Sequence, residues 1–334
     1  MEVCNHDPTL VDRFIERYQG WVMKFAFLFP GQGSQSVGML AAYGDIPSVR
    51  QVVNEASDIL GQDIGRLIAE GPASELNRTV NTQPVMVTVG YAAYCGWLEL
   101  GGTSPTIAAG HSLGEYTALV AAGVLSLADC LPLVRLRAQA MQDAVPVGQG
   151  AMAAILGMED DGVRKACAEA SQGQVVEAVN FNAPGQVVIA GHSDAVARAI
   201  EHAKANGAKR AVVLPVSAPF HSSLMAPAAE KLRIALDKVS LSAPHFPVVH
   251  NVDGRLRSNP TEIKAALVSQ ADHPVLWSDC IKTIAAFGVL HALECGPGKV
   301  LAPLCKRISS GLEGVALTDK AALEKGIATV KAES

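Results

Sequence analysis

The chain has 334 residues, 49% of them hydrophobic, which is enough for one large domain or two smaller ones with a substantial core. Its 27 lysines and arginines stand against 32 aspartates and glutamates, so the net charge is −5. A global nucleic-acid binder would be basic, and this class is excluded, although a local basic patch could still face an acidic partner.

The N-terminal residues 1–22 carry acids and bases throughout and lack the apolar segment of a signal peptide. Met23 directly precedes an apolar run, FAFLF (25–29), which is ended by Pro30 and Gly31 and is typical of a buried parallel strand. We therefore expect residues 1–22 to be an extension outside the fold.

Alternating strand and helix patterns follow. Helical patterns fill most of 37–100, a second short strand is expected at 106–110, and helices are expected at 115–123 and 127–144. The apolar stretch 117–136 includes Asp129, Pro132 and Arg135, so it does not qualify as a membrane span.

A module with a different order comes next, and we place it at residues 146–217. The expected elements are strands at 152–157, 175–181, 186–191 and 210–216 and helices at 161–171 and 193–207. The order β-α-β-β-α-β is the ferredoxin-like pattern.

The alternating frame resumes with strands at 246–251 and 289–296. The sequence thus predicts an α/β fold: a core with a mainly parallel sheet, residues 23–145 and 218–334, plus an inserted ferredoxin-like subdomain. Functional sites in such sheets form at the carboxyl ends of the strands.

The seven cysteines are scattered and form no C-x-x-C pair. This distribution argues against a zinc site and against a disulfide framework. We expect mostly buried thiols in a reducing cytoplasm.

The motif GHSLG at 110–114 fits G-x-S-x-G, with Ser112 on a turn between an expected strand and an expected helix. Small neighbours let such a turn pack closely, and the turn would expose the serine hydroxyl at a helix N-terminus, where developing negative charge is favoured. The motif also arises by chance at this glycine and serine content. The prediction of a nucleophile therefore depends on the expected strand before the motif and the expected helix after it.

A nucleophilic serine needs a base, and His221 is the candidate among nine histidines. It lies 109 residues after Ser112, an order that suits an α/β-hydrolase-like sheet; an ordinary loop histidine is the alternative. The neighbouring His111 should point away from the hydroxyl. Asp253 and Asp272 could orient the base, and a backbone carbonyl could do the same.

An oxyanion formed at Ser112 would need two N–H donors. We expect the backbone N–H of Leu113 and that of Gln32, which lies in PGQGSQ (30–35) between two glycines. A dinucleotide-binding loop does not fit here, because its third glycine would fall on Ser36.

Arg135 and Arg137 lie on an otherwise apolar helix, and the helical period lets only one of them face inward. A buried guanidinium needs an anion, and a carboxylate suits its two-pronged geometry best. From the residues alone, a structural salt bridge is the ordinary explanation of such an arginine.

Eight motifs together carry a resemblance. They are FPGQGSQ, NTQP, GHSLGEY, RLRAQAMQ, GAMAAILG, NFNAPGQVVIAG, SAPFHSSLM and ECGPGKVL. In this order they closely resemble the malonyl-CoA:acyl carrier protein transacylase family of type II fatty acid synthesis, from Met23 almost to the C-terminus. The family fold, a hydrolase-like core with a ferredoxin-like insert, agrees with the organisation above.

The resemblance implies roles for individual residues. Ser112 matches the acylated serine, His221 its base, Arg137 the arginine that binds the malonyl carboxylate, and Gln32 and Leu113 the oxyanion-hole donors.

Further residues near the site follow from the same resemblance. Gln270 matches a glutamine whose main chain orients the histidine, Asn182 an asparagine lining the cleft, and Phe220 a ring that favours malonyl over methylmalonyl by crowding. His111 is expected to line the site. Ala138 and Gln139 replace a glycine and a lysine common in relatives, which leaves the carboxylate-binding arginine in place.

The expected activity is transfer of malonyl from malonyl-CoA to the phosphopantetheine thiol of acyl carrier protein, with no metal or redox cofactor, no nucleic acid and no membrane, by a monomer. A serine thioesterase or esterase, an acyltransferase of a polyketide pathway and a non-catalytic binding module are the alternatives. The basic pairs Lys209–Arg210 and Lys306–Arg307 are candidate carrier-protein contacts.

Overall fold

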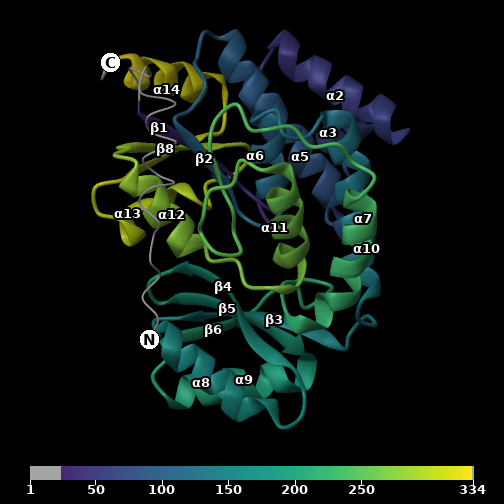
Figure 1. The fold of residues 1–334 in the computed structure, drawn as a ribbon, viewed down its shortest axis with the longest axis vertical. Helices are drawn as coiled ribbons and strands as arrows, with labels where there is room; N and C mark the ends of the chain where they lie inside the picture. The colour runs from purple at the N-terminus through teal and green to yellow at the C-terminus, as the bar shows by residue number, and fades with distance from the viewer. Residues whose placement is uncertain (1–23, 333–334) are drawn as a thin grey trace.

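The computed structural model describes residues 24–332, so the predicted extension 1–22 lies outside the described residues. The chain forms two sheets, a five-stranded one and a four-stranded one. In Figure 1 the elements of the smaller sheet lie at the lower end of the molecule, with α8 and α9 beneath them, and the larger sheet lies above. The predicted fold class is confirmed.

The larger sheet is parallel, with the strand order β7-β2-β1-β8-β9. Its strands are β1 (Phe25–Phe29), β2 (Ile107–Gly110), β7 (Val248–Val249), β8 (His291–Cys295) and β9 (Glu313–Leu317). Alternate side chains of β1 enter different cores: Phe25 and Phe27 pack on one face, and Ala26 and Leu28 on the other. Both faces are therefore buried, as parallel sheets require.

Helices cover both faces of this sheet. They are η1 (Ala41–Tyr43), α2 (Pro47–Leu60), α3 (Ile64–Glu70), α4 (Ala73–Leu76), α5 (Thr79–Glu99), α6 (Gly114–Ala121), α7 (Leu127–Asp143), η2 (Ser223–Met225), α10 (Ala226–Leu236), α11 (Pro260–Asp272), α12 (Trp277–Ala286), α13 (Ala302–Ile308) and α14 (Lys320–Ala332). Helices α5, α6 and α7 share the core of the β1 phenylalanines, whereas α12 and α13 pack on the opposite face. Among residues 24–332, no helix has the length and hydropathy of a membrane span.

The smaller sheet is antiparallel, in the order β4-β5-β3-β6. Its elements are β3 (Gly150–Leu156), α8 (Asp160–Ser171), β4 (Val176–Ala183), β5 (Gln186–His192), α9 (Ser193–Ala205) and β6 (Arg210–Val213). The two helices share one hydrophobic core with one face of the sheet. The other face carries Met152 and Val179, against which Leu214 and Phe220 pack.

The strands differ from expectation in several places, and the strand expected at 210–216 ends at Val213 as β6. The strand expected at 246–251 shortens to β7, because the N–H of His250 bonds Arg255 O and the N–H of Asn251 bonds the Glu115 carboxylate instead of a strand. The edge strand β9 was not predicted, because its apolar run, Val315–Leu317, is only three residues long.

Candidate active site

The nucleophile turn lies between β2 and α6, at the carboxyl end of the parallel sheet. Ser112 has a φ of 50°, a left-handed backbone that is strained for a residue other than glycine. A Cβ atom on Gly110 would lie 1.9 Å from the carbonyl carbon of Gly114, and one on Gly114 would lie 2.0 Å from Phe29 O. The two glycines of the motif are thus required by close backbone approach.

His221 contacts the Ser112 hydroxyl. Its Nε2 lies 2.7 Å from Ser112 Oγ, and its Nδ1 lies 2.8 Å from the main-chain oxygen of Gln270. Because a carbonyl can only accept, Nδ1 carries the hydrogen and Nε2 is left to accept from the serine. His221 is buried and also has a left-handed backbone, with a φ of 65°.

The two candidate aspartates do not contact His221. Asp253 pairs with Arg257 and Asp272 with His273. The backbone carbonyl of Gln270 therefore occupies the place that an acid takes in a serine–histidine–aspartate triad.

Burial, and then the positive charge of Arg137, lower the pKa of His221 to about 3, while the hydrogen bond to Gln270 O opposes the shift. The imidazole is consequently neutral near pH 7 and able to accept a proton.

Arg137 is the inward-facing arginine of α7, with 2% of its surface exposed. Its Nη1 donates to Gln83 Oε1 at 2.9 Å, and its Nη2 to Gln270 Oε1 at 2.9 Å and to Ser112 Oγ at 3.3 Å. Arg135 faces the other way and donates to Leu60 O. A buried guanidinium therefore lies directly beside the serine hydroxyl.

A cavity of about 130 Å³ opens onto these groups. It is lined by Gln32, Gln83, His111, Ser112, Leu113, Arg137, Met141, Met152, Asn180, Leu214, Val216, Phe220 and His221. Among the hydrogen bonds of residues 24–332, none uses the backbone N–H of Gln32 or Leu113. Asn182 reaches the site indirectly, through a 2.8 Å hydrogen bond to His111 Nε2.

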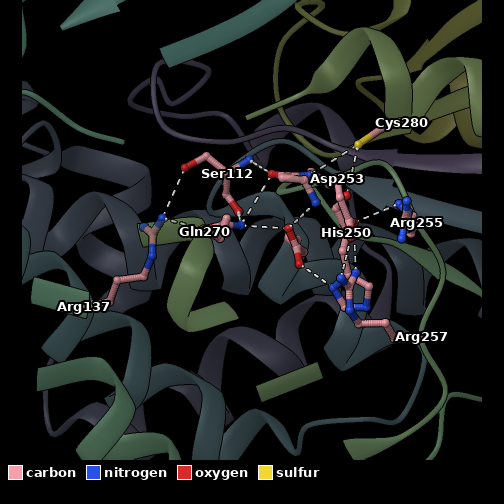
Figure 2. Close-up of polar contacts among 11 residues, drawn as sticks. Ser112, Arg137, His250, Asp253, Arg255, Arg257, Gln270 and Cys280 are labelled. Carbon is pink, nitrogen blue, oxygen red and sulfur yellow. Dashed lines mark hydrogen bonds and ion pairs between the residues drawn. The ribbon is translucent and has the colours of Figure 1, made fainter. Parts of the chain in front are cut away.

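Three polar residues at this site were missed from the sequence. Gln83 binds Arg137; Asn251 accepts from Ser112 N at 2.7 Å and donates to Gly110 O at 2.8 Å; Glu115 binds both Gln270 and Asn251. A usable signal existed for Glu115, an acidic residue in the first turn of an otherwise apolar helix. Figure 2 shows these polar contacts continuing from Ser112 and Gln270 to His250.

Comparisons with known proteins agree with this geometry. Residues 26–312 match the acyl transferase domain family. The malonyl CoA-acyl carrier protein transacylase of Escherichia coli K12 is 53% identical over 301 residues, covering 90% of this chain and 97% of that protein. The crystal structure of an acyl-carrier-protein S-malonyltransferase from Burkholderia pseudomallei 1710b is 62% identical, with a TM-score of 0.90, covering 92% of this chain and 100% of that one.

A third comparison includes a partner. A malonyl-transacylase in complex with its type II polyketide synthase acyl carrier protein is 48% identical, with a TM-score of 0.90, covering 92% of this chain and 99% of that one. From the matched domain, the identities and the coverage together, the chain is an acyltransferase and belongs to the malonyl CoA-acyl carrier protein transacylase family.

Proposed function

We propose that this acyltransferase moves a malonyl group from malonyl-CoA to the phosphopantetheine thiol of acyl carrier protein, through a malonyl ester on Ser112. One observation carries the proposal: Ser112 Oγ lies 2.7 Å from a neutral base and 3.3 Å from a buried guanidinium. A nucleophile so placed can attack a thioester whose acyl group ends in a carboxylate.

The first half-reaction forms the ester. Ser112 Oγ attacks the thioester carbonyl carbon while His221 Nε2 takes the hydroxyl proton. The backbone N–H groups of Gln32 and Leu113 stabilise the oxyanion, and Arg137 binds the distal carboxylate. The C–S bond then breaks, and His221 returns the proton to the departing CoA sulfur.

The second half-reaction runs in reverse with another thiol. CoA leaves, and the pantetheine sulfur of the carrier protein gives its proton to His221 and attacks the ester carbonyl. The proton returns to Ser112 Oγ as the ester bond breaks. These steps use side-chain and backbone groups of the protein and no cofactor, and we place them in the cytoplasm as part of fatty acid synthesis.

The test is a single-turnover acylation followed by a chase. After mixing with malonyl-CoA, intact mass spectrometry should show an adduct of about 86 Da, the malonyl increment of a covalent ester. Holo acyl carrier protein should then remove the adduct and acquire it. Ser112→Ala should form no adduct; an adduct on this variant would place the nucleophile elsewhere.

The same assay separates the alternatives. A thioesterase would release free malonate faster than it loads the carrier protein. A polyketide role is the alternative that has one observation in its support, a structural neighbour in complex with a type II polyketide synthase carrier protein. This alternative predicts faster loading of a polyketide carrier than of a fatty acid carrier.

A further inference from the structure

Glu115 is a carboxylate buried in the core directly behind the nucleophile turn, with none of its surface exposed. Its Oε1 lies 2.7 Å from His250 Nδ1, and its Oε2 accepts from Asn251 N at 3.0 Å and from Gln270 Nε2 at 2.9 Å. One of these donors, the His250 imidazole, lies within ion-pair distance of the carboxylate, and none is a lysine or an arginine. Because burying a carboxylate at this depth is costly, its position calls for an explanation beyond packing.

Arg137 presents the complementary problem. It is a buried cation, and its hydrogen-bond partners are the neutral oxygens of Gln83, Gln270 and Ser112. Among residues 24–332, no carboxylate lies within ion-pair distance of it. Burial lowers the pKa of Arg137, and Tyr116 and then the nearby charge of Glu115 oppose this shift.

The side chain of Gln270 joins the two charges. Its Oε1 accepts a hydrogen bond from Arg137, and its Nε2 donates one to Glu115. The same Nε2 also donates to Ser112 O at 2.9 Å. Arg137 can only donate and the Glu115 carboxylate can only accept, so the amide has a single favourable orientation. Figure 2 shows Gln270 between Arg137 and the buried cluster around His250.

We infer that Glu115 is a positioning residue for acyl-group selection: it acts through the Gln270 amide as the counter-ion of Arg137, and leaves the guanidinium itself open to the substrate carboxylate. A carboxylate in direct contact with Arg137 would occupy the site where the malonyl carboxylate binds. A carboxylate separated from Arg137 by the Gln270 amide stabilises the cation and leaves that site open. The inference rests on the proposed function, in which Arg137 binds the malonyl carboxylate.

The experiment compares Glu115→Gln with Glu294→Gln. Glu294 is also fully buried and accepts three backbone N–H groups, from Val300, Leu301 and Ala302, away from Ser112. Both substitutions keep the shape of the side chain and remove one buried negative charge. Glu294→Gln therefore measures the general effect of removing a buried carboxylate charge. Single-turnover acylation is measured with malonyl-CoA and with acetyl-CoA, which has no distal carboxylate.

We expect Glu115→Gln to lower the malonyl-to-acetyl ratio of kcat/KM about tenfold, mainly through the KM for malonyl-CoA, the scale of one charge-assisted hydrogen bond. Glu294→Gln should leave this ratio within about twofold of the wild type, since it touches no group near Arg137. An unchanged ratio in Glu115→Gln, or an equal loss for both acyl groups, would overturn the inference.

A second variant keeps the inference testable if Glu115→Gln does not fold, as judged by thermal unfolding. Gln270→Leu keeps the main-chain oxygen that faces His221 and removes the amide bridge. A selective loss of malonyl acylation is expected, and equal loss for both acyl groups contradicts the inference. Absence of any malonyl adduct on the wild-type enzyme would instead refute the proposed function.

Discussion

The Ser112 hydroxyl has two neighbours with opposite charge requirements. His221 must be neutral to accept the serine proton, and Arg137 must be charged to bind a carboxylate. The positive charge of Arg137 helps to keep His221 neutral, since it is the second cause of the lowered pKa after burial. Binding of the malonyl carboxylate would offset this charge and make the imidazole a stronger base at the moment when it is needed.

Arg137→Ala should lower kcat/KM for malonyl-CoA about a hundredfold, because two charge-assisted hydrogen bonds to the substrate carboxylate are lost. Acetyl-CoA acylation should be spared or improved. Arg135→Ala is the matched control, two residues away on the outer side of α7, and should leave the malonyl-to-acetyl ratio unchanged. Parallel acylation assays check this, and an equal loss for both acyl groups would show that Arg137 does not bind the carboxylate.

The pH dependence of acylation tests the coupling between His221 and Arg137. With a pKa of about 3 for His221, the wild-type rate with acetyl-CoA should stay flat as the pH falls through the ordinary histidine range. In Arg137→Ala one cause of the lowering is gone, so the pKa of His221 rises and the rate should fall already at a higher pH. Quenched-flow acylation between about pH 4 and 8 measures both profiles. Coincident profiles would contradict the coupling.

Among the elements, the β2–α6 turn is where backbone packing determines chemistry. The chain reverses within three residues, so Gly114 packs against the end of β1 while Ser112 is held in a left-handed conformation. The loop that carries Gln32 follows the same end of β1. Two strands of one sheet therefore hold the hydroxyl and the proposed oxyanion donors at one edge.

Gly114→Ala should destabilise the protein by about 2–3 kcal/mol, because the added methyl group would meet Phe29 O at 2.0 Å. The sign is informative, since alanine normally favours a helix over glycine. Gly311→Ala is the control, because a Cβ there meets nothing within 4 Å. Urea unfolding of both variants measures the change, and equal stability would show that the turn is not closely packed.

The elements were largely predictable, and the polar network was not. Short apolar runs bounded by glycine and proline located β1 and β2, since burial on both faces leaves that pattern in the sequence. Apolar runs also located the strands of the smaller sheet, although β6 has no buried residue. The contacts of Gln83 and Asn251 could not be found in this way, because each joins residues distant along the chain. The edge strand β9 was missed because only three consecutive apolar residues, Val315–Leu317, mark it in the sequence.

At the scale of the whole molecule, the site lies where the two sheets meet. The backbone of β4 bonds Val275 of the core through Phe181 N and Val179 O. The cavity wall draws on both parts, with Met152 and Asn180 from the smaller sheet facing Ser112 and His111 from the core. Transfer to a thiol in competition with water needs such a narrow cleft, because an open one would admit water to the ester.

The His111–Asn182 hydrogen bond provides a test of that closure, since its two ends belong to the two parts of the molecule. Asn182→Ala leaves the His111 N–H without its partner, so we expect a loss of about 1 kcal/mol in the free energy of unfolding. We also expect more malonate release relative to transfer. Asn206→Ala, an exposed change that removes a bond to His202 O at the C-terminal end of α9, is the control for both measurements. If Asn182→Ala and Asn206→Ala give the same ratio of malonate release to malonyl transfer, the His111–Asn182 contact does not shield the ester from water. Exclusion of water must then come from the apolar wall around Phe220.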